Sequence, residues 1–331
     1  RAACMMTNRS QLSHLLVLAL YLLLALALTW PLVTHLMTHI PGTAVWAFDE
    51  STFVWNMWWF RYSLLTLGSS PLHTDYIFYP LGVDLVLYTF NFFNAMLGLP
   101  FTMLVPLPLA SNLVILFAYV MSGYGAYLLV CYLLTRYSRR AIHDRGSGVS
   151  SASVLYVRLA ALAAGAAYAF AASRMVYAAL GHYDMVTAQW FPFYALFLLK
   201  ALRQSGYRYP LLAGVCATFA LLAEMIFGVF LLLLTLVLVF GELAGRRWQW
   251  LLSALPRLGL IALVTAVLWS PVMVPILRAF AQANYALTGW GEGLKLSADV
   301  VGWFTPTALH PWWGAPDWSA HLRAVVEGKA Q

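Results

Sequence analysis

Long apolar stretches separated by short polar segments dominate this chain. The first covers residues 12–33, and others cover 109–135, 158–173, 186–202 and 258–277. A helix needs about 20 apolar residues to cross a hydrocarbon layer of about 30 Å. The first stretch is long and no small-residue cleavage site follows it, so we interpret it as an uncleaved span. The pattern predicts an all-α, polytopic transmembrane helical bundle of about 7 to 9 spans.

The apolar run at 210–241 is too long for one comfortable crossing. It holds Glu224 near its middle and Gly228 just after it. An ionisable side chain is costly at membrane depth. We therefore predict a hairpin of two helices with Glu224 at the turn.

Residues 34–108 are mixed in character and form the predicted first outer loop. We expect a helix near 51–67, rich in tryptophan, and an apolar piece at 91–108 that Pro100, Pro106 and Pro108 interrupt. The second piece could lie on the surface, re-enter the membrane or cross it at a tilt. The charge pattern requires that both pieces cross or that neither does, and we favour outer-face surface helices.

Composition and charge agree with a membrane location. The chain has 331 residues, of which 62% are hydrophobic and 9% charged, whereas soluble domains carry about 25% charged residues. Basic residues gather in alternate loops, which places the N-terminus in the cytoplasm. The net charge of +7 is thereby explained by orientation, and no nucleic-acid partner is expected.

Acidic residues are scarce and fall almost entirely on the predicted outer side. They form four groups, namely Asp49 with Glu50, Asp75 with Asp84 near His73, Asp184 near His182, and Glu224. Acids do little to set topology, so their gathering on one side suggests a shared site.

Each group also has a simple structural interpretation. Asp49 could cap the helix that follows it, Asp75 could form an Asx-turn, and Asp184 could cap a helix end. The functional interpretation is a catalytic carboxylate at Asp49, with Glu50 adjoining it. His73, Asp75 and Glu224 are then candidates for substrate binding.

A divalent metal is the cofactor that such a site would take. Mg²⁺ and Mn²⁺ prefer carboxylate oxygens, and Mn²⁺ also accepts imidazole. Asp184 and His182 are the candidate ligands. Arg61, Arg174 and Arg278 are outer-side arginines that could hold phosphate oxygens, although Arg174 and Arg278 could equally end helices and snorkel.

The order of motifs resembles the membrane glycosyltransferases of the GT-C superfamily. The segments that carry the resemblance are FDES, VWNMWWFRYSLL, HTDYIFYPLGVDL, SGYGAYLLV, LGHYDMVTAQWFPFYALFLL and SADVVGWFTPTALHPWWG. They are spread over most of the chain.

The resemblance implies a catalytic base in the first outer loop, matched by Asp49, and a second acidic motif after the third span, matched by His182 and Asp184. Gln189, in the same segment, is a further candidate for substrate binding. The implied donor is a polyprenyl-phosphate-linked sugar, and some members use a divalent metal. The second motif departs from the Asp-x-Asp or Glu-x-Asp form, because its first residue is His.

The domains expected are a GT-C-like transmembrane domain at 1–280 and an extracytoplasmic tail at 281–331, interpreted as the start of a longer C-terminal region. The function expected is an inverting glycosyltransferase of the cytoplasmic membrane that acts on the extracytoplasmic face, with membrane lipid and an unidentified acceptor as partners. Alternatives are a proton-coupled transporter or lipid flippase that uses Glu224, and a non-catalytic membrane subunit. The transferase requires Asp49 and Asp184 to lie close together, whereas the transporter requires Glu224 deep between helices and far from both.

Overall fold

The computed structural model describes residues 2–42, 49–86, 88–145, 151–244 and 248–282, and single residues of the tail at 305, 318, 320, 321 and 324. The chain divides into two compact units, Arg1–Arg278 and Ala279–Gln331. The first unit holds almost all of the described residues. Most of the predicted tail at 281–331 lies outside them.

Helices make up 79% of the structure, and sheet is almost absent from the described residues, which confirms the all-α prediction. The helices are α1 (Ala2–Leu28), α2 (Asp49–Tyr62), α3 (Phe92–Leu104), α4 (Leu107–Arg145), α5 (Ser151–Ala169), α6 (Ala172–Ala179), α7 (Tyr183–Val186), α8 (Trp190–Arg203), α9 (Arg208–Ala223), α10 (Phe227–Leu243) and α11 (Trp248–Gln282). Short 3₁₀ and π segments occupy Leu32–Thr34 and Ser63–Leu67. Strands β1 (His73–Thr74) and β2 (Val83–Asp84) pair antiparallel, with His73 opposite Asp84.

The predicted hairpin at 210–241 is confirmed, because α9 ends at Ala223 and α10 begins at Phe227. Other boundaries differ from the prediction. The expected loop at 136–158 is largely helical, since α4 continues to Arg145 and α5 begins at Ser151. The expected loop at 173–184 contains α6 and the start of α7, because alanines and small apolar residues favour short helices there.

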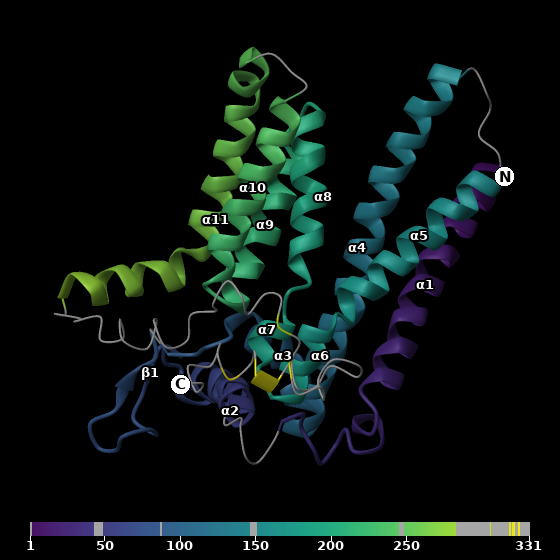
Figure 1. Ribbon diagram of the computed structural model, residues 1–331. Coiled ribbons are helices and arrows are strands. Elements are labelled where there is room, and N and C mark those ends of the chain that lie inside the picture. The colour runs from purple at the N-terminus through teal and green to yellow at the C-terminus, as the bar shows by residue number, and fades with distance from the viewer. Residues whose placement is uncertain are drawn as a thin grey trace. The chain divides into compact units, whose positions relative to one another are not determined.

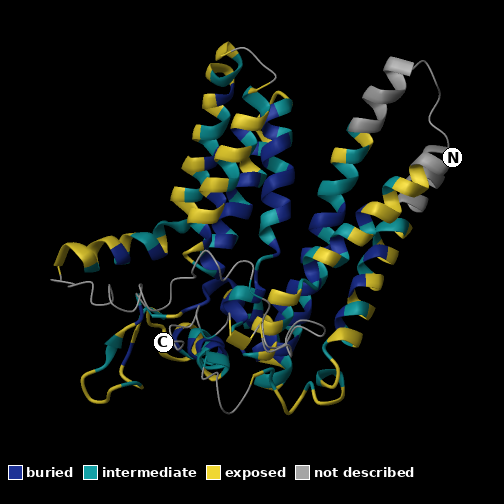
Figure 2. Cartoon of the chain, viewed as in Figure 1, coloured by how far each residue is buried: buried dark blue, intermediate teal, exposed yellow. Residues whose placement is uncertain are grey.

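Within the described ranges, five stretches of helix are long and apolar enough to cross a membrane, namely Gln11–Leu28, Leu107–Arg136, Val154–Ala179, Tyr183–Arg203 and Trp248–Gln282. Helices α3, α9 and α10 are apolar but shorter. Side chains of α10 such as Val229, Leu232 and Val237 are exposed, and Figure 2 shows such exposed positions along α10 and α11. Exposed apolar helix faces of this kind are compatible with contact to lipid.

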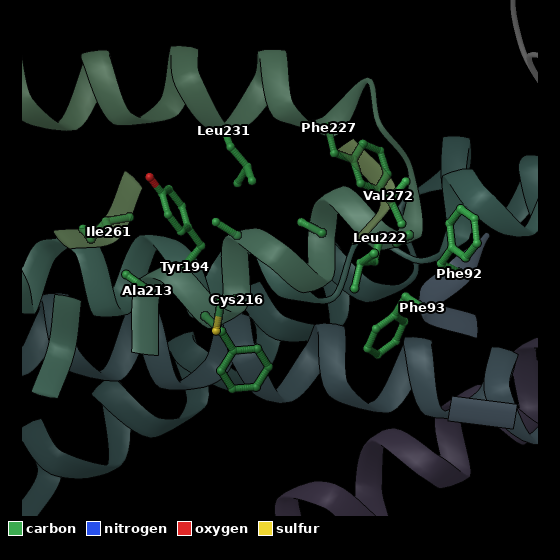
Figure 3. Close-up of a cluster of buried hydrophobic side chains, with 14 of the residues drawn as sticks. Phe92, Phe93, Tyr194, Ala213, Cys216, Leu222, Phe227, Leu231, Ile261 and Val272 are labelled. Carbon is green, nitrogen blue, oxygen red and sulfur yellow. The ribbon is translucent and has the colours of Figure 1, made fainter. Parts of the chain in front are cut away.

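Helix α4 packs against α1, α5 and α8, and α8 packs against α9 and α10 (Figure 1). The largest buried cluster joins α8–α11 to α3, through residues such as Phe93, Tyr194 and Leu222 (Figure 3). Helices α2, α3 and α7 pack together near the start of α4. This group of short helices positions the candidate site.

Close approach of α1, α4 and α5 depends on a glycine. Tyr21 of α1 is fully buried, and its hydroxyl donates a hydrogen bond to the Leu162 carbonyl at 3.1 Å. A Cβ atom on Gly165 would overlap the Tyr21 hydroxyl and would lie 2.8 Å from Tyr21 Cζ. Helix α5 therefore packs this closely only with glycine at position 165.

We expect Gly165→Ala to destabilise the protein by about 1–3 kcal/mol through overpacking. The measurement is the thermal unfolding midpoint of the purified protein in detergent. The matched control is Gly259→Ala on α11, where no described residue outside its own turn of helix lies within 4 Å of the added Cβ and alanine improves helix propensity. Equal midpoints for the two variants would contradict the proposed packing role of Gly165.

Candidate functional site

Two segments that are distant in sequence meet at a close polar contact between Asp49 and His182. Asp49 lies in the first turn of α2, and His182 is the N-cap residue of α7. The Nδ1 atom of His182 lies 3.1 Å from Oδ2 of Asp49. Their side chains are 32% exposed for His182 and 46% exposed for Asp49, so both remain accessible to a ligand. The FDES and GHYD segments thus belong to one site.

Glu50 lies next to this pair and packs closely against Gly181. Gly181 has a φ of +79°, and a Cβ atom there would lie 2.7 Å from both Cβ and Oε2 of Glu50. Oε2 of Glu50 is buried and has no hydrogen-bond partner among the described residues. The hydroxyl of Tyr183 donates to the Pro41 carbonyl at 2.8 Å, which ties α7 to the loop after α1.

Asp184 and Glu224 extend the acidic cluster. Asp184 is buried, with 7% of the residue exposed, and its Oδ1 atom has no hydrogen-bond partner among the described residues. Its carboxyl group interacts with the carboxyl of Glu224 and lies within electrostatic range of Asp49 and His182. Burial above all raises the pKa of Glu224, and the nearby Asp184 adds to this.

The contact between Asp184 and Glu224 is relevant to the prediction that the acidic groups share one site. Three of the four predicted acidic groups, at 49–50, 182–184 and 224, come together here. Glu224 itself lies in the connector between α9 and α10. This position beside Asp184 differs from the isolated, deep position that the transporter interpretation required.

A cavity of about 660 Å³ lies beside the acidic cluster. Its lining comes from the end of α1 and the loop after it, from α4 and from α6, and is largely apolar: Leu28, Thr29, Trp30, Pro31, Leu32, His35, His39, Ile40, Pro41, Gly42, Ile115, Met175, Ala178 and Ala179. Gly42 links the cavity to the acids, because an added Cβ there would lie 2.7 Å from the Glu50 side chain. The rings of His35 and His39 are 4.8 Å apart within this lining. An apolar chamber thus adjoins a cluster of carboxylates.

The fourth acidic group, Asp75 and Asp84 near His73, lies apart from this cluster, on the exposed β1–β2 hairpin. His73 Nδ1 lies 2.7 Å from Oδ1 of Asp84, and its Nε2 lies 3.1 Å from Oδ1 of Asp75. Both ring nitrogens are therefore occupied within the hairpin. Substrate binding by His73 and Asp75 stays a prediction, and the observed geometry gives them a structural partner instead.

The hydrogen bond to Asp84 raises the pKa of His73 above its usual value near 6.5, and Asp75 adds to this. A raised pKa means that the charged imidazole stabilises the hairpin below about pH 6.5 and that this contribution is lost as pH rises through the folded-state pKa. We expect Asp84→Asn to lower the His73 pKa more than Asp75→Asn does. Proton NMR titration of histidine-labelled protein, with His73→Gln for assignment, measures both values. A larger effect from Asp75→Asn would contradict this order.

Two of the three predicted phosphate-binding arginines, Arg61 and Arg174, are engaged by backbone carbonyls. Arg174 is buried and donates to the carbonyls of Tyr168 at 3.3 Å, Ala169 at 3.1 Å and Val186. Arg61 donates to the carbonyl of Thr102. Arg174 thus satisfies the C-terminal carbonyls of α5, a role that guanidinium groups commonly play at helix ends. Phosphate binding by Arg61, Arg174 and Arg278 stays a prediction.

The tryptophans of α2 pack with aromatic side chains rather than lining the cavity. Trp59 is 2% exposed and its indole N–H donates to the Pro71 carbonyl at 3.0 Å. Trp58 stacks on Tyr62 with ring centroids 5.0 Å apart, and Tyr76 of the hairpin contacts both rings. This aromatic cluster joins the hairpin to α2.

Gln189 is fully buried at the start of α8, and neither its Oε1 nor its Nε2 has a hydrogen-bond partner among the described residues. Sequence reasoning selected Gln189 but missed the polar side chains of α3 beside its segment. Asn94 donates to Thr187 Oγ1 at 2.9 Å. Asparagines within an aromatic helix carried no distinguishing signal in the sequence.

Asp184 and His182 were the predicted metal ligands, and metal binding by them stays a prediction. In the part of the chain that the structure describes, no group of three or more His, Cys, Asp or Glu side chains is arranged to hold a metal ion. His182 Nδ1 is already paired with Asp49. Dependence on Mg²⁺ or Mn²⁺ stays a prediction.

Comparisons with protein-family models, with curated proteins and with solved structures found no match. The function is therefore argued from the geometry of the site.

Proposed function

We propose that the chain is a membrane glycosyltransferase that moves a sugar from a polyprenyl-phosphate-linked donor to an acceptor on the extracytoplasmic face. The observation that carries the proposal is the Asp49–His182 pair at 3.1 Å, next to a largely apolar cavity of about 660 Å³. A lipid-linked sugar needs both features, because its tail is apolar and its reacting end is polar.

Asp49 is the general base in this proposal. Its carboxylate accepts the proton of the acceptor hydroxyl as the acceptor oxygen bonds to the anomeric carbon. At the same time the bond from that carbon to the lipid phosphate breaks, and the phosphate leaves with the electron pair. One such displacement inverts the anomeric configuration. A positioned base contributes about 10²–10⁴-fold to a rate.

His182 and the acidic neighbours position this base. His182 contacts Asp49 through Nδ1, which fixes the carboxylate in the direction of the acceptor. Asp184 lies within electrostatic range of Asp49, and its carboxyl group interacts with that of Glu224. The apolar cavity next to Glu50 receives the first prenyl units of the donor.

A donor panel tests the proposed function. The full chain is purified into lipid nanodiscs and incubated with polyprenyl monophosphate and diphosphate donors that carry different radiolabelled hexoses, together with membranes of the expressing cells as the acceptor source. We expect label to leave the organic-soluble fraction with at least one donor. If no donor is consumed above the level of empty nanodiscs, the proposed function is wrong.

A further inference from the structure

A second cavity, of about 480 Å³, lies at the end of α8. Its wall comes from the last residues of α8, from the connector that leads to α9 and from the first part of α11. Helix α8 begins at Trp190, shortly after α7, and ends at Arg203 in the cavity wall. The cavity and the acidic cluster are therefore at opposite ends of α8 (Figure 1).

The cavity lies where two candidate membrane spans end. One of these spans, Tyr183–Arg203, finishes in the cavity wall, and the other, Trp248–Gln282, begins two residues before Trp250 of the wall. Tyr207 also lines the cavity, and tyrosine and tryptophan rings favour the boundary between lipid headgroups and water. Both features favour a position at the level of the headgroups.

The wall contains two arginines, and they differ in how their charge is balanced. Arg203 donates from Nε to Oε1 of Glu242 at 2.7 Å, so a carboxylate balances its charge. Arg257 donates from Nη1 to the carbonyls of Ala201 at 2.8 Å and Gln204 at 2.9 Å. Carbonyl oxygens carry no net charge, and Arg257 forms no ion pair with any described residue. The cavity wall thus keeps one positive charge that no acid balances.

Arg257 is held in place and still has hydrogen-bond donors to offer. A third bond runs from its Nη2 to the Ser253 carbonyl at 3.0 Å. A guanidinium group has five N–H donors, so two of them, including that of Nε, make no bond to a described residue. The planar guanidinium suits phosphate oxygens, and a side chain that is already fixed loses little entropy when an anion binds.

Exposed apolar side chains continue along α11 from the cavity. Leu252 and Leu255 are exposed, and they alternate with Ser253, Pro256 and Arg257 of the wall; Figure 2 shows exposed positions along this helix. Acyl chains can cover such a surface, whereas a soluble anion leaves it uncovered. A positive cavity with an apolar surface beside it matches a phospholipid that has an anionic headgroup.

We propose that this cavity binds the headgroup phosphate of an anionic phospholipid, with Arg257 on the phosphate oxygens and the acyl chains along α11. Basic pockets between membrane helices are known to hold anionic headgroups. The volume of about 480 Å³ lies within the range of about 300–1,000 Å³ that is usual for small-molecule sites. The site is separate from the acidic cluster, so the inference does not depend on the proposed function.

Lipid binding to the full chain tests the inference. The purified protein in a neutral detergent is titrated with phosphatidylglycerol, which is anionic, or with phosphatidylcholine, which has no net charge. Native mass spectrometry gives the Kd of the first lipid that binds. We expect the wild type to bind phosphatidylglycerol about tenfold more tightly, the effect of one charge-assisted hydrogen-bonded contact. Arg257→Gln should bind the two lipids about equally.

A second variant leaves the bonds of Arg257 intact. Ser205 is exposed and lines the cavity, so Ser205→Glu places a negative charge in the wall without removing a contact of Arg257. This variant should also lose the preference, and it serves if Arg257→Gln fails to fold. The control is Arg158→Gln, an exposed arginine on α5 that lines neither cavity. All three substitutions lower the net charge by one unit, and only the control should keep the preference.

Glycerol 1-phosphate, the headgroup portion without acyl chains, separates a lipid site from a site for soluble phosphate. We expect it not to displace phosphatidylglycerol when both are present at the same concentration. Displacement under these conditions would show a soluble-phosphate site and overturn the lipid assignment. A wild type without the preference, a preference that persists in both cavity variants, or an equal loss in Arg158→Gln would also overturn the inference.

Discussion

Replacing Asp49 by asparagine is expected to lower the rate of sugar transfer by about 10²–10⁴-fold, the contribution of a positioned general base. Asparagine keeps the size of the side chain and a hydrogen-bonding oxygen toward His182, but it cannot accept a proton from the acceptor. The fold should be unaffected, because the Asp49 side chain is 46% exposed. The measurement is the initial rate with the donor that the panel identifies, together with the thermal unfolding midpoint.

The matched control is Asp84→Asn, which neutralises an acid of the same segment, 34–108, that pairs with His73 in the hairpin. We expect this variant to transfer sugar at nearly the wild-type rate. Full activity in Asp49→Asn, or an equal loss in both variants, would remove Asp49 from the role of base.

The second large effect is expected from Gly181→Ala. The added methyl group would lie 2.7 Å from Glu50, so the turn before His182 or the start of α2 must move. A misplacement of about 1 Å at a reacting centre can cost about 10²-fold in rate. We therefore expect the transfer rate to fall by about that factor while the protein remains folded.

A second variant, Gly68→Ala, tests whether backbone strain alone lowers the activity, without displacement of Glu50. Gly68 also has a left-handed φ, of +61°, but apart from its chain neighbours no described residue lies within 4 Å of its added Cβ. Both variants incur the left-handed penalty of about 1–2 kcal/mol in stability. Only Gly181→Ala should lose activity. If the two variants lost activity equally, the contact between Gly181 and Glu50 would have no functional role.

The helical architecture followed from apolar periodicity and length because a membrane leaves few options for the backbone. The break at Glu224 was predictable for the same reason, since a carboxyl group favours a connector over the middle of a span. Helices α6 and α7 were not predicted, because their short sequences mix small, polar and aromatic residues. The lengths of α4 and α11 were also underestimated, because their polar ends continue as helix beyond the apolar stretch.

The acidic residues of the site could be predicted from the sequence, whereas its other polar groups could not. The FDES and GHYD segments were selected for carboxylates that stand out in an apolar chain, and Asp49 and His182 do meet. The role of Arg174 depends on carbonyls that only the fold brings to it. The cavity lining could not be predicted from the sequence either, because it combines the loop after α1 with α4 and α6.

Cross-linking tests most directly whether the two acidic segments form one site. Cys4, Cys131 and Cys216 are first replaced by alanine, and Asp49→Cys and His182→Cys are then introduced together into the full chain in nanodiscs. We expect a short bifunctional thiol reagent to join positions 49 and 182 within one molecule, as detected by mass spectrometry of the linked peptides. If each single cysteine reacts with a maleimide but the pair is never joined, the two segments lie apart and the proposed site does not exist.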